Sequence, residues 1–140
     1  MSRNRASAKK AGASFERLVA DHLSEQLDDD RIDRRVKHGA KDKGDIGGVR
    51  TIRGGRVVIE VKNVSRDGLP GWIAEAEVER LNDNAAIGVV CHKKHGSAKA
   101  GEQYISMTLD TFIELLKGAP QPVDVMEQAP EVAYVGGQEG

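Results

Sequence analysis

Apolar residues recur at intervals of three and four in several segments of the chain, a spacing typical of amphipathic helices. The clearest stripe joins Phe15, Val19 and Leu23. Ser14 precedes it and is a suitable N-cap, because its hydroxyl can accept a hydrogen bond from an unpaired N–H of the first turn. Asp110 can cap a later helix in the same way. The predicted helices cover residues 14–27, 72–84 and 111–117.

Five shorter segments, rich in β-branched residues and bounded by glycine or polar residues, predict strands. They cover residues 32–36, 45–52, 56–63, 86–92 and 103–109. The second strand is weakened by Gly47 and Gly48, which indicate a bulge or a close approach by another backbone or a ligand. The short turn at residues 53–55 makes the second and third strands antiparallel neighbours.

The order of these elements is helix, three strands, helix, two strands, helix. A three-strand meander followed by a helical crossover to a central apolar strand predicts an α/β domain. Its mixed β-sheet of about five strands would be flanked by helices on both faces. At 140 residues the chain is long enough for one domain with a modest core. We expect this domain at residues 13–118, between a disordered basic arm at 1–12 and a flexible acidic tail at 119–140.

The composition fits a globular protein. With 39% hydrophobic, 31% charged and only 4% aromatic residues, aliphatic side chains must build the core. No apolar run approaches the roughly 18 residues of a transmembrane helix, and the basic amino terminus lacks the apolar centre of a secretory signal. The single cysteine, Cys91, excludes an intrachain disulfide framework and any zinc site built on several cysteines. We therefore expect no membrane partner and a reducing, cytoplasmic setting.

Basic and acidic residues are unevenly distributed along the chain. Residues 1–66 hold 16 Lys and Arg against 10 Asp and Glu, whereas residues 67–140 hold 5 against 12. A basic half attracts polyanions and can supply phosphate contacts, so a nucleic acid is an expected partner. The alternative is a solvated surface with scattered charges.

The third predicted strand, in the stretch GGRVVIEVKN, carries two charges inside an apolar run. Side chains alternate faces along a strand, so Val57, Ile59 and Val61 share one face. Glu60 and Lys62 share the other. Burying these charges costs several kcal/mol each unless something compensates, as a divalent metal and a phosphate would. The alternative is an edge strand whose charged face is solvated.

Asp45 opens the neighbouring strand in the stretch KGDIGG. Because the two strands are antiparallel, Asp45 and Glu60 are expected near each other at the same end of the sheet. Two carboxylates and the backbone carbonyl of Val61 are hard oxygen ligands that suit Mg²⁺. Lys62 beside such an ion would orient a water or stabilise charge on a phosphate. An ordinary lysine pKa of about 10.4 favours electrostatic stabilisation over the role of a base.

The spacing D-x14-E-x-K formed by Asp45, Glu60 and Lys62 resembles the signature of the PD-(D/E)XK nuclease superfamily. The resemblance extends over about residues 14–96, although Gly44 stands where the motif's name has proline. It implies a restriction-endonuclease-like core and a Mg²⁺- or Mn²⁺-dependent phosphodiesterase. In such an enzyme Asp45 and Glu60 would bind the metal, and Lys62 would help to position the attacking water.

Glu16, in the first predicted helix, matches the acidic residue that the Holliday-junction-resolvase-like branch, of phage or prokaryotic type, places beside the metal. The resemblance therefore implies that Glu16 touches the metal or its water. A glutamate in a first helical turn also simply complements the helix dipole. The branch further implies a homodimer with two active sites, because resolving a four-way DNA junction takes two coordinated cuts.

Basic residues near the expected site are candidate contacts to DNA phosphates. They lie before Asp45 and after the central apolar strand: Arg34, Arg35, Lys37, His38, Lys41, Lys43, Lys93 and Lys94. The alternative is that these loops are merely solvated. Glu75, Glu77 and Glu79 are expected on the solvent side of the second long helix, with Glu77 within reach of the rim of the site.

Three functions are open from these residues. The first is a metal-dependent endonuclease that cuts branched DNA, most specifically a Holliday junction resolvase. The second is a restriction- or repair-type enzyme of the same superfamily that cuts duplex DNA, and RNA is not excluded because phosphate contacts are blind to the sugar. The third is a non-catalytic nucleic-acid-binding module, which would have no use for Asp45, Glu60 and Lys62 together.

Overall fold

The chain folds into helices and strands in the order expected from the sequence, and the computed structural model describes residues 4–36 and 41–123. The helices are α1 (Arg5–Gln26), α2 (Leu69–Asp83), α3 (Leu109–Leu116) and a short 3-10 helix, η1 (Ala100–Glu102). The strands are β1 (Asp33–Arg34), β2 (Ile46–Gly47), β3 (Val57–Lys62), β4 (Ile87–His92) and β5 (Tyr104–Ser106). The predicted α/β class is confirmed.

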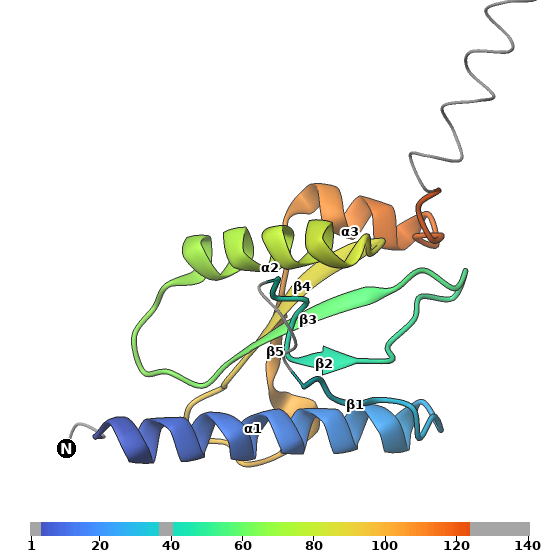
Figure 1. Cartoon of the computed structure of the whole chain (residues 1–140). Coiled ribbons are helices and arrows are strands. Elements are labelled where there is room, and N and C mark those ends of the chain that lie inside the picture. Colours follow the sequence, from blue (N-terminus) through green and yellow to red (C-terminus); the bar gives the residue numbers. More distant parts are fainter. Residues whose placement is uncertain (1–3, 37–40, 124–140) are drawn as a thin grey trace, which may run out of the picture.

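The strands form a single mixed sheet in the order β1-β2-β3-β4-β5. β3 and β4 run parallel and are joined by the α2 crossover, whereas the other neighbouring pairs are antiparallel. α1 covers one face of the sheet, and α2 and α3 cover the other (Figure 1). The expectation of a mixed sheet with helices on both faces is therefore confirmed, and β3 lies at its centre.

β3 carries both the core and the charged pair. Its apolar side chains join those of α1 in one buried cluster that includes Val57, Ile59, Val61, Phe15 and Val19. Glu60 and Lys62 point to the opposite face, where they meet Glu79 and Glu75 of α2. Glu60 is only 5% exposed. The alternative of an edge strand with a solvated charged face is therefore wrong.

The first helix begins nine residues before the predicted cap at Ser14. Asn4 is the N-cap of α1, and its side chain accepts a hydrogen bond from the Ser7 N–H at 2.8 Å. The expected disordered arm at residues 1–12 is thus wrong from Arg5 onward, and residues 1–3 lie outside the described range. This first part of α1 has no apolar stripe. Its alanines and lysines are strong helix formers, which explains why the segment is helical without burying a face.

The folded domain also continues past residue 118, the expected start of the tail. Ala119 is buried in the core cluster, and its carbonyl accepts a hydrogen bond from the Thr51 hydroxyl at 2.6 Å. The Gln121 side chain accepts from the Arg56 N–H at 2.8 Å and donates to the Asn84 carbonyl at 2.7 Å. Residues 119–123 therefore belong to the fold, and the rest of the expected tail lies outside the described residues.

Two local features differ in detail from their predictions. Thr108 caps α3 in place of Asp110, with its hydroxyl accepting from the Thr111 N–H at 3.1 Å. β2 is only two residues long because the chain turns at Gly48, which has a φ of +89°. A Cβ at Gly48 would come within 2.5 Å of the Arg31 carbonyl oxygen. The close approach of another backbone, one of the expected reasons for this glycine, is thus confirmed.

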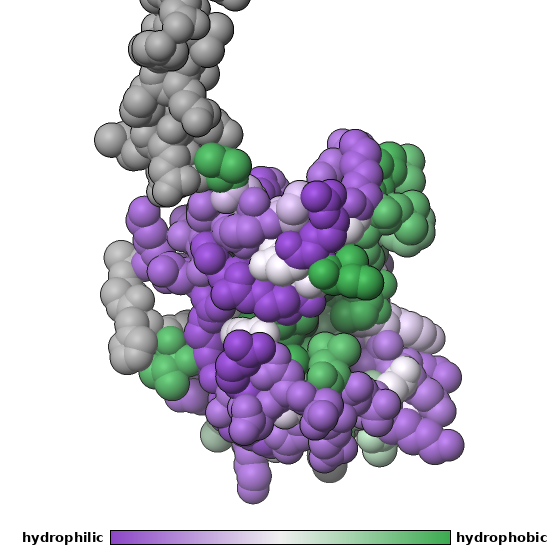
Figure 2. Space-filling model, turned by 90° about the vertical axis from the view of Figure 1, so that its right-hand side faces the viewer, coloured by the Kyte–Doolittle hydropathy of each residue, from purple (hydrophilic) through white to green (hydrophobic). Residues whose placement is uncertain are grey.

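The visible surface is mostly polar, with apolar side chains in one region. Figure 2 shows hydrophilic residues over most of one face and hydrophobic side chains gathered toward one edge of the view. α3 contributes the largest group of exposed apolar side chains among the described helices: Leu109, Phe112, Ile113, Leu115 and Leu116. In the described part of the chain, no helix combines the length and the apolar character needed to cross a membrane.

Candidate active site

Asp45 is fixed in place by three hydrogen bonds. Its backbone N–H donates to the Ile59 carbonyl at 2.9 Å, and its own carbonyl accepts from the Arg35 N–H at 2.8 Å. Its carboxylate Oδ2 accepts from the Val61 N–H at 2.8 Å. The Asp45 side chain thus accepts a hydrogen bond from β3 that a backbone carbonyl of a neighbouring strand would otherwise accept. The Asp45 carboxylate is therefore held against the second half of β3.

Gly44 allows this close approach of the loop to β3. Its φ is +94°, a value that proline cannot adopt because its ring holds φ near −65°. A Cβ at this position would lie 3.0 Å from Val58 Cγ1 and 3.2 Å from the Ile59 carbonyl oxygen. The departure from the proline of the motif's name thus has a physical reason in this chain.

The Glu60 carboxyl group meets the carboxyl groups of Asp45 and Glu79. It lies within hydrogen-bonding reach of both. Burial, followed by the contacts with these two carboxyl groups, raises the pKa of Glu60 to about 12. In the absence of a cation, one proton is therefore held on Glu60 at neutral pH. Asp45 and Glu60 are brought together on one side of β3, as the antiparallel arrangement of their strands predicts.

Lys62 lies on the same face of β3 as Glu60 and is bound by α2. Its Nζ donates to both carboxylate oxygens of Glu75, at 3.1 and 3.3 Å. Burial alone lowers the pKa of Lys62, but the hydrogen bond to Glu75 and the charges of Glu60, Glu75 and Asp45 raise it above the ordinary value. Lys62 is therefore a stable cation, which fits the stabilisation of charge and does not fit a base.

The backbone of β3 presents Val61 to the same edge as Asp45. The Val57 N–H donates to the Val49 carbonyl, and the Ile59 carbonyl accepts from the Asp45 N–H. Alternate residues of β3 therefore direct their backbone groups toward the β2 side. Val61 continues this alternation, and its N–H already binds Asp45. Its carbonyl therefore faces the same side of the strand, the side where a metal bound by Asp45 would take it as a ligand.

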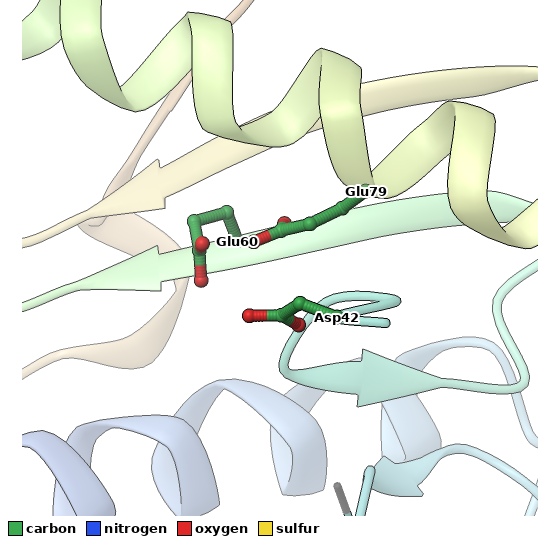
Figure 3. Close-up of side chains that lie close together, drawn as sticks. All are labelled: Asp42, Glu60 and Glu79. Atoms are coloured by element: carbon green, nitrogen blue, oxygen red, sulfur yellow. The ribbon is translucent and has the colours of Figure 1, made fainter. Parts of the chain in front are cut away.

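A second group of carboxylates was not expected from the sequence. One carboxylate oxygen each of Asp42, Glu60 and Glu79 lies within 4.8 Å of the others (Figure 3). Glu79 is 3% exposed, and its Oε2 has no hydrogen-bond partner among the described residues. Asp42 is half-buried, and its Oδ1 accepts from the Gly44 N–H at 2.9 Å. α2 thus supplies a buried carboxylate to the site.

The expectation that Glu79 faces solvent is therefore wrong, whereas Glu75 and Glu77 are exposed as expected. Glu77 is bound to Arg80 at 2.6 Å and does not reach the carboxylate group. Glu79 follows Ala76 by three residues and so shares its buried side of α2. That spacing is the signal in the sequence that would have identified Glu79.

Glu16 comes to the site from the opposite face of the sheet. It lies on α1, 3.6 Å from Arg34 Nε in an ion pair. Together with Asp45 it lines a pocket of about 490 Å³. The structure thus brings Glu16 to the Asp45 side of the site, but not into the group formed by Asp42, Glu60 and Glu79.

Most of the described basic residues expected to contact DNA are bound within the protein. Their ion pairs are Arg34 with Glu16, Arg35 with Asp83 at 3.3 Å, and Lys94 with Glu102 at 3.6 Å. The Lys93 ammonium donates to the carbonyls of Lys94 and Ser97 in its own loop. Lys41 and Lys43 are exposed on either side of Asp42. Lys37 and His38 lie outside the described residues.

No protein-family model, curated protein or solved structure matches this chain. The chemistry of the site is therefore inferred from its own residues.

The donor set of Asp45, Glu60 and the Val61 carbonyl fits a hard divalent cation. All three are oxygen donors, the type that Mg²⁺ and Mn²⁺ prefer. The two carboxylates are buried, at 8% and 5% exposure, so a bound cation would offset the repulsion that otherwise keeps a proton on Glu60. The group leaves coordination positions for waters or a phosphate oxygen, since Mg²⁺ takes six ligands and retains several waters.

Proposed function

We propose that this protein is a metal-dependent nuclease with a restriction-endonuclease-like core, which hydrolyses phosphodiester bonds at Asp45, Glu60 and Lys62. One observation carries the proposal. The buried carboxyl groups of Asp45, just before β2, and Glu60 of β3 meet, and Lys62, on the same face of β3 as Glu60, is held as a cation. A core strand has little structural use for such a group, because burying these charges is costly. Cation-assisted phosphoryl chemistry has a use for all three, because the carboxylates hold the ion and the lysine stabilises charge on the phosphate.

The residues have separate roles in this proposal. Asp45 and Glu60, with the Val61 carbonyl, would hold Mg²⁺ or Mn²⁺. The bound ion would lower the pKa of a water and neutralise charge on the phosphate. Asp45 is oriented by the Val61 N–H, and its carboxylate lies within hydrogen-bonding reach of the Glu60 carboxyl group. Lys62 donates to a nonbridging phosphate oxygen and stabilises the charge that develops there.

Glu16 is proposed to act from the α1 side, through a water in the pocket that it shares with Asp45. The pocket is also lined by Arg17, Arg34 and Arg35, whose charges are compensated by ion pairs with Asp33, Glu16 and Asp83. Lys41 and Lys43 add two exposed cations in the loop before Asp45. These two lysines support a polyanionic substrate.

We further propose that the substrate is branched DNA and that the protein is a Holliday junction resolvase acting inside the cell. The support is the resemblance of Glu16, Asp45, Glu60 and Lys62 to that branch of the superfamily. Resolution takes two coordinated cuts, so this proposal includes a homodimer with two active sites. Light scattering of the purified protein tests it, and a mass of one chain at assay concentrations would contradict the resolvase while leaving the nuclease intact.

The proposal is tested by incubating the protein with a four-way junction, its matching linear duplex, a flap and a single strand, with Mg²⁺ or with EDTA. We expect Mg²⁺-dependent cleavage of the junction, and none by Asp45→Asn. Asp110→Asn, which alters an exposed carboxylate in α3, serves as the control and should cleave as the wild type does. Preferential cutting of duplex would favour a restriction- or repair-type enzyme. No metal-dependent cleavage of any form would leave only a binding module.

A further inference from the structure

We infer that Asp42, Glu60 and Glu79 form a binding site for one hard divalent cation, with Glu79 of α2 as a direct ligand. The nuclease resemblance assigns no role to Asp42 or Glu79. The site is defined by protein oxygens alone, so it would stand even if the protein cleaved no phosphodiester bond.

The three carboxylates converge from parts of the chain that are far apart in sequence. Asp42 lies in the loop before β2, Glu60 in β3 and Glu79 in the later part of α2. Figure 3 shows Glu60 and Glu79 pointing toward each other, with Asp42 facing them from the loop. One oxygen of each lies within 4.8 Å of the others. At magnesium–oxygen distances of about 2.1 Å, two ligands of one ion are about 3 Å apart when adjacent and about 4 Å apart when opposite, so the carboxylate oxygens would close on an ion by moving up to about 2 Å.

Glu79 supplies the observation that points to a ligand. It is 3% exposed, and its Oε2 has no hydrogen-bond partner among the described residues. Buried polar atoms are normally hydrogen-bonded, and a buried carboxylate oxygen without a partner is costly, even though the Glu79 carboxyl group is also within hydrogen-bonding reach of Glu60. A cation between Glu79 and Glu60 would give this oxygen a partner.

Among residues 4–36 and 41–123, no basic side chain is recorded in contact with Glu79. The groups that act on Glu79 are all carboxyl groups: Glu60 is within hydrogen-bonding reach, and Asp42, Asp45 and Glu75 act through their charge. Lys62, on the same face of β3 as Glu60, is bound to Glu75, and Arg80, the next residue of α2, is bound to Glu77. The concentration of negative charge is therefore not compensated within the described residues.

The competing explanation is that a proton shared by Glu60 and its neighbours holds the carboxyl groups together without a metal. The two explanations differ in what happens when Mn²⁺ is added. A proton-bridged cluster would bind Mn²⁺ weakly or not at all, whereas a cation site would bind one ion and release the proton.

The test is a titration of the full, metal-free chain with Mn²⁺, with free Mn²⁺ followed by electron paramagnetic resonance. We expect one ion per chain in the wild type, and binding weaker by at least about tenfold in Glu79→Gln. Glu77→Gln, which changes an exposed glutamate two residues earlier on the same helix, should bind as the wild type does. No saturable binding by the wild type, or equal affinity in Glu79→Gln, would overturn the site.

Two further variants keep the test decisive. Asp42→Asn retains an oxygen that accepts the Gly44 N–H, so it should fold normally and also bind Mn²⁺ at least about tenfold more weakly. Asp45→Asn should weaken the binding as well, because Asp45 lies against the Glu60 carboxyl group and is a proposed ligand of the same ion. If Asp45→Asn abolished binding and Asp42→Asn did not, the cation would belong to Asp45 and Glu60 alone, and this inference would be wrong. Melting curves in EDTA confirm that each variant is folded.

The inferred site shares Glu60 with the metal of the proposed function, but this titration contains no nucleic acid, so its readout is separate from cleavage. Saturable binding that depends on Glu79, together with no cleavage of any substrate, would refute the nuclease and leave the cation site. Cleavage by the wild type, together with unchanged Mn²⁺ affinity in Glu79→Gln, would support the nuclease and refute the cation site.

Discussion

The carboxylate of Asp45 accepts a hydrogen bond from the backbone N–H of Val61 at 2.8 Å, so a side chain from the start of β2 completes the hydrogen bonding of β3. One residue thus has two tasks. It stabilises the central strand, and it places a carboxylate beside Glu60. Substitutions that keep the first task and remove the second can separate stability from activity.

Asp45→Asn and Asp45→Ala should differ in stability but agree in activity. Asparagine retains a side-chain oxygen that can accept the Val61 N–H, whereas alanine leaves this buried donor unpaired. We expect Asp45→Ala to lose about 1–3 kcal/mol of unfolding free energy relative to Asp45→Asn. Neither variant should cleave DNA, because the charge is absent in both. Urea unfolding in EDTA measures the first difference, and equal stability of the two variants would show that the hydrogen bond contributes nothing.

Glu60→Gln should stabilise the metal-free protein, and more so at higher pH. Folding raises the pKa of Glu60 from 4.5 to about 12, through burial and then through Asp45 and Glu79. Above its ordinary pKa the unfolded chain releases this proton while the folded chain keeps it. The associated stability is complete below that pKa and is lost as the pH rises, by up to about 1.4 kcal/mol per pH unit. Glutamine does not titrate and removes this loss.

The measurement is the free energy of unfolding in EDTA between about pH 6 and pH 8. Wild type and the control Glu77→Gln should lose stability in parallel as the pH rises, and the difference between Glu60→Gln and wild type should widen. A constant difference across this range would mean that Glu60 is already ionised in the folded protein.

Lys62→Ala should lower the cleavage rate by about 100-fold or more with little change in DNA affinity, because the ammonium acts on charge that develops in the transition state. Glu75→Gln should have a smaller effect, below about tenfold, since it only loosens the group that holds Lys62. Single-turnover rates at saturating enzyme, with affinities measured separately in Ca²⁺, distinguish the two. An equal loss of affinity and rate in Lys62→Ala would identify Lys62 as a binding residue only.

The central part of the site could be predicted because it depends on two regular features. The period of two along β3 separates Glu60 and Lys62 from Val57, Ile59 and Val61. The short turn to β2 brings Asp45 to the same end of the sheet. Both follow from local geometry and require no knowledge of how the helices pack.

Features that depend on packing or on caps could not be predicted in this way. The burial of Glu79 depends on which turn of α2 lies over Glu60. The start of α1 depends on a cap at Asn4 and on helix propensity, with no apolar stripe to mark it. Residues 119–123 were expected in the tail because prolines and the lack of basic residues suggested disorder. Their partners, Thr51 and Arg56, lie more than 60 residues away in the chain.

Gln121→Ala should reveal the contribution of this carboxyl-terminal segment. It removes the acceptor of the half-buried Arg56 N–H and the donor to the Asn84 carbonyl. We expect a loss of about 1–3 kcal/mol in unfolding free energy, from the unpaired backbone group. Val123→Ala changes an exposed side chain two residues later and should lose less than about 0.5 kcal/mol. Equal effects of the two substitutions would show that residues 119–123 do not stabilise the domain.

Replacing both Lys41 and Lys43 with glutamine should weaken DNA binding and reduce its dependence on salt. The two ammonium groups are exposed beside the Asp42 carboxylate. If each neutralises one phosphate, the slope of log affinity against log salt should fall in magnitude by about 1.8. Lys99 and Lys117 are also exposed but are ion-paired with Glu102 and Glu114. Their double glutamine variant removes the same charge and serves as the control. Both double variants remove two positive charges. An equal change of the salt slope in the two would therefore assign the effect to net charge and not to the position of the lysines. A change confined to the first variant would place the nucleic-acid backbone over the carboxylates.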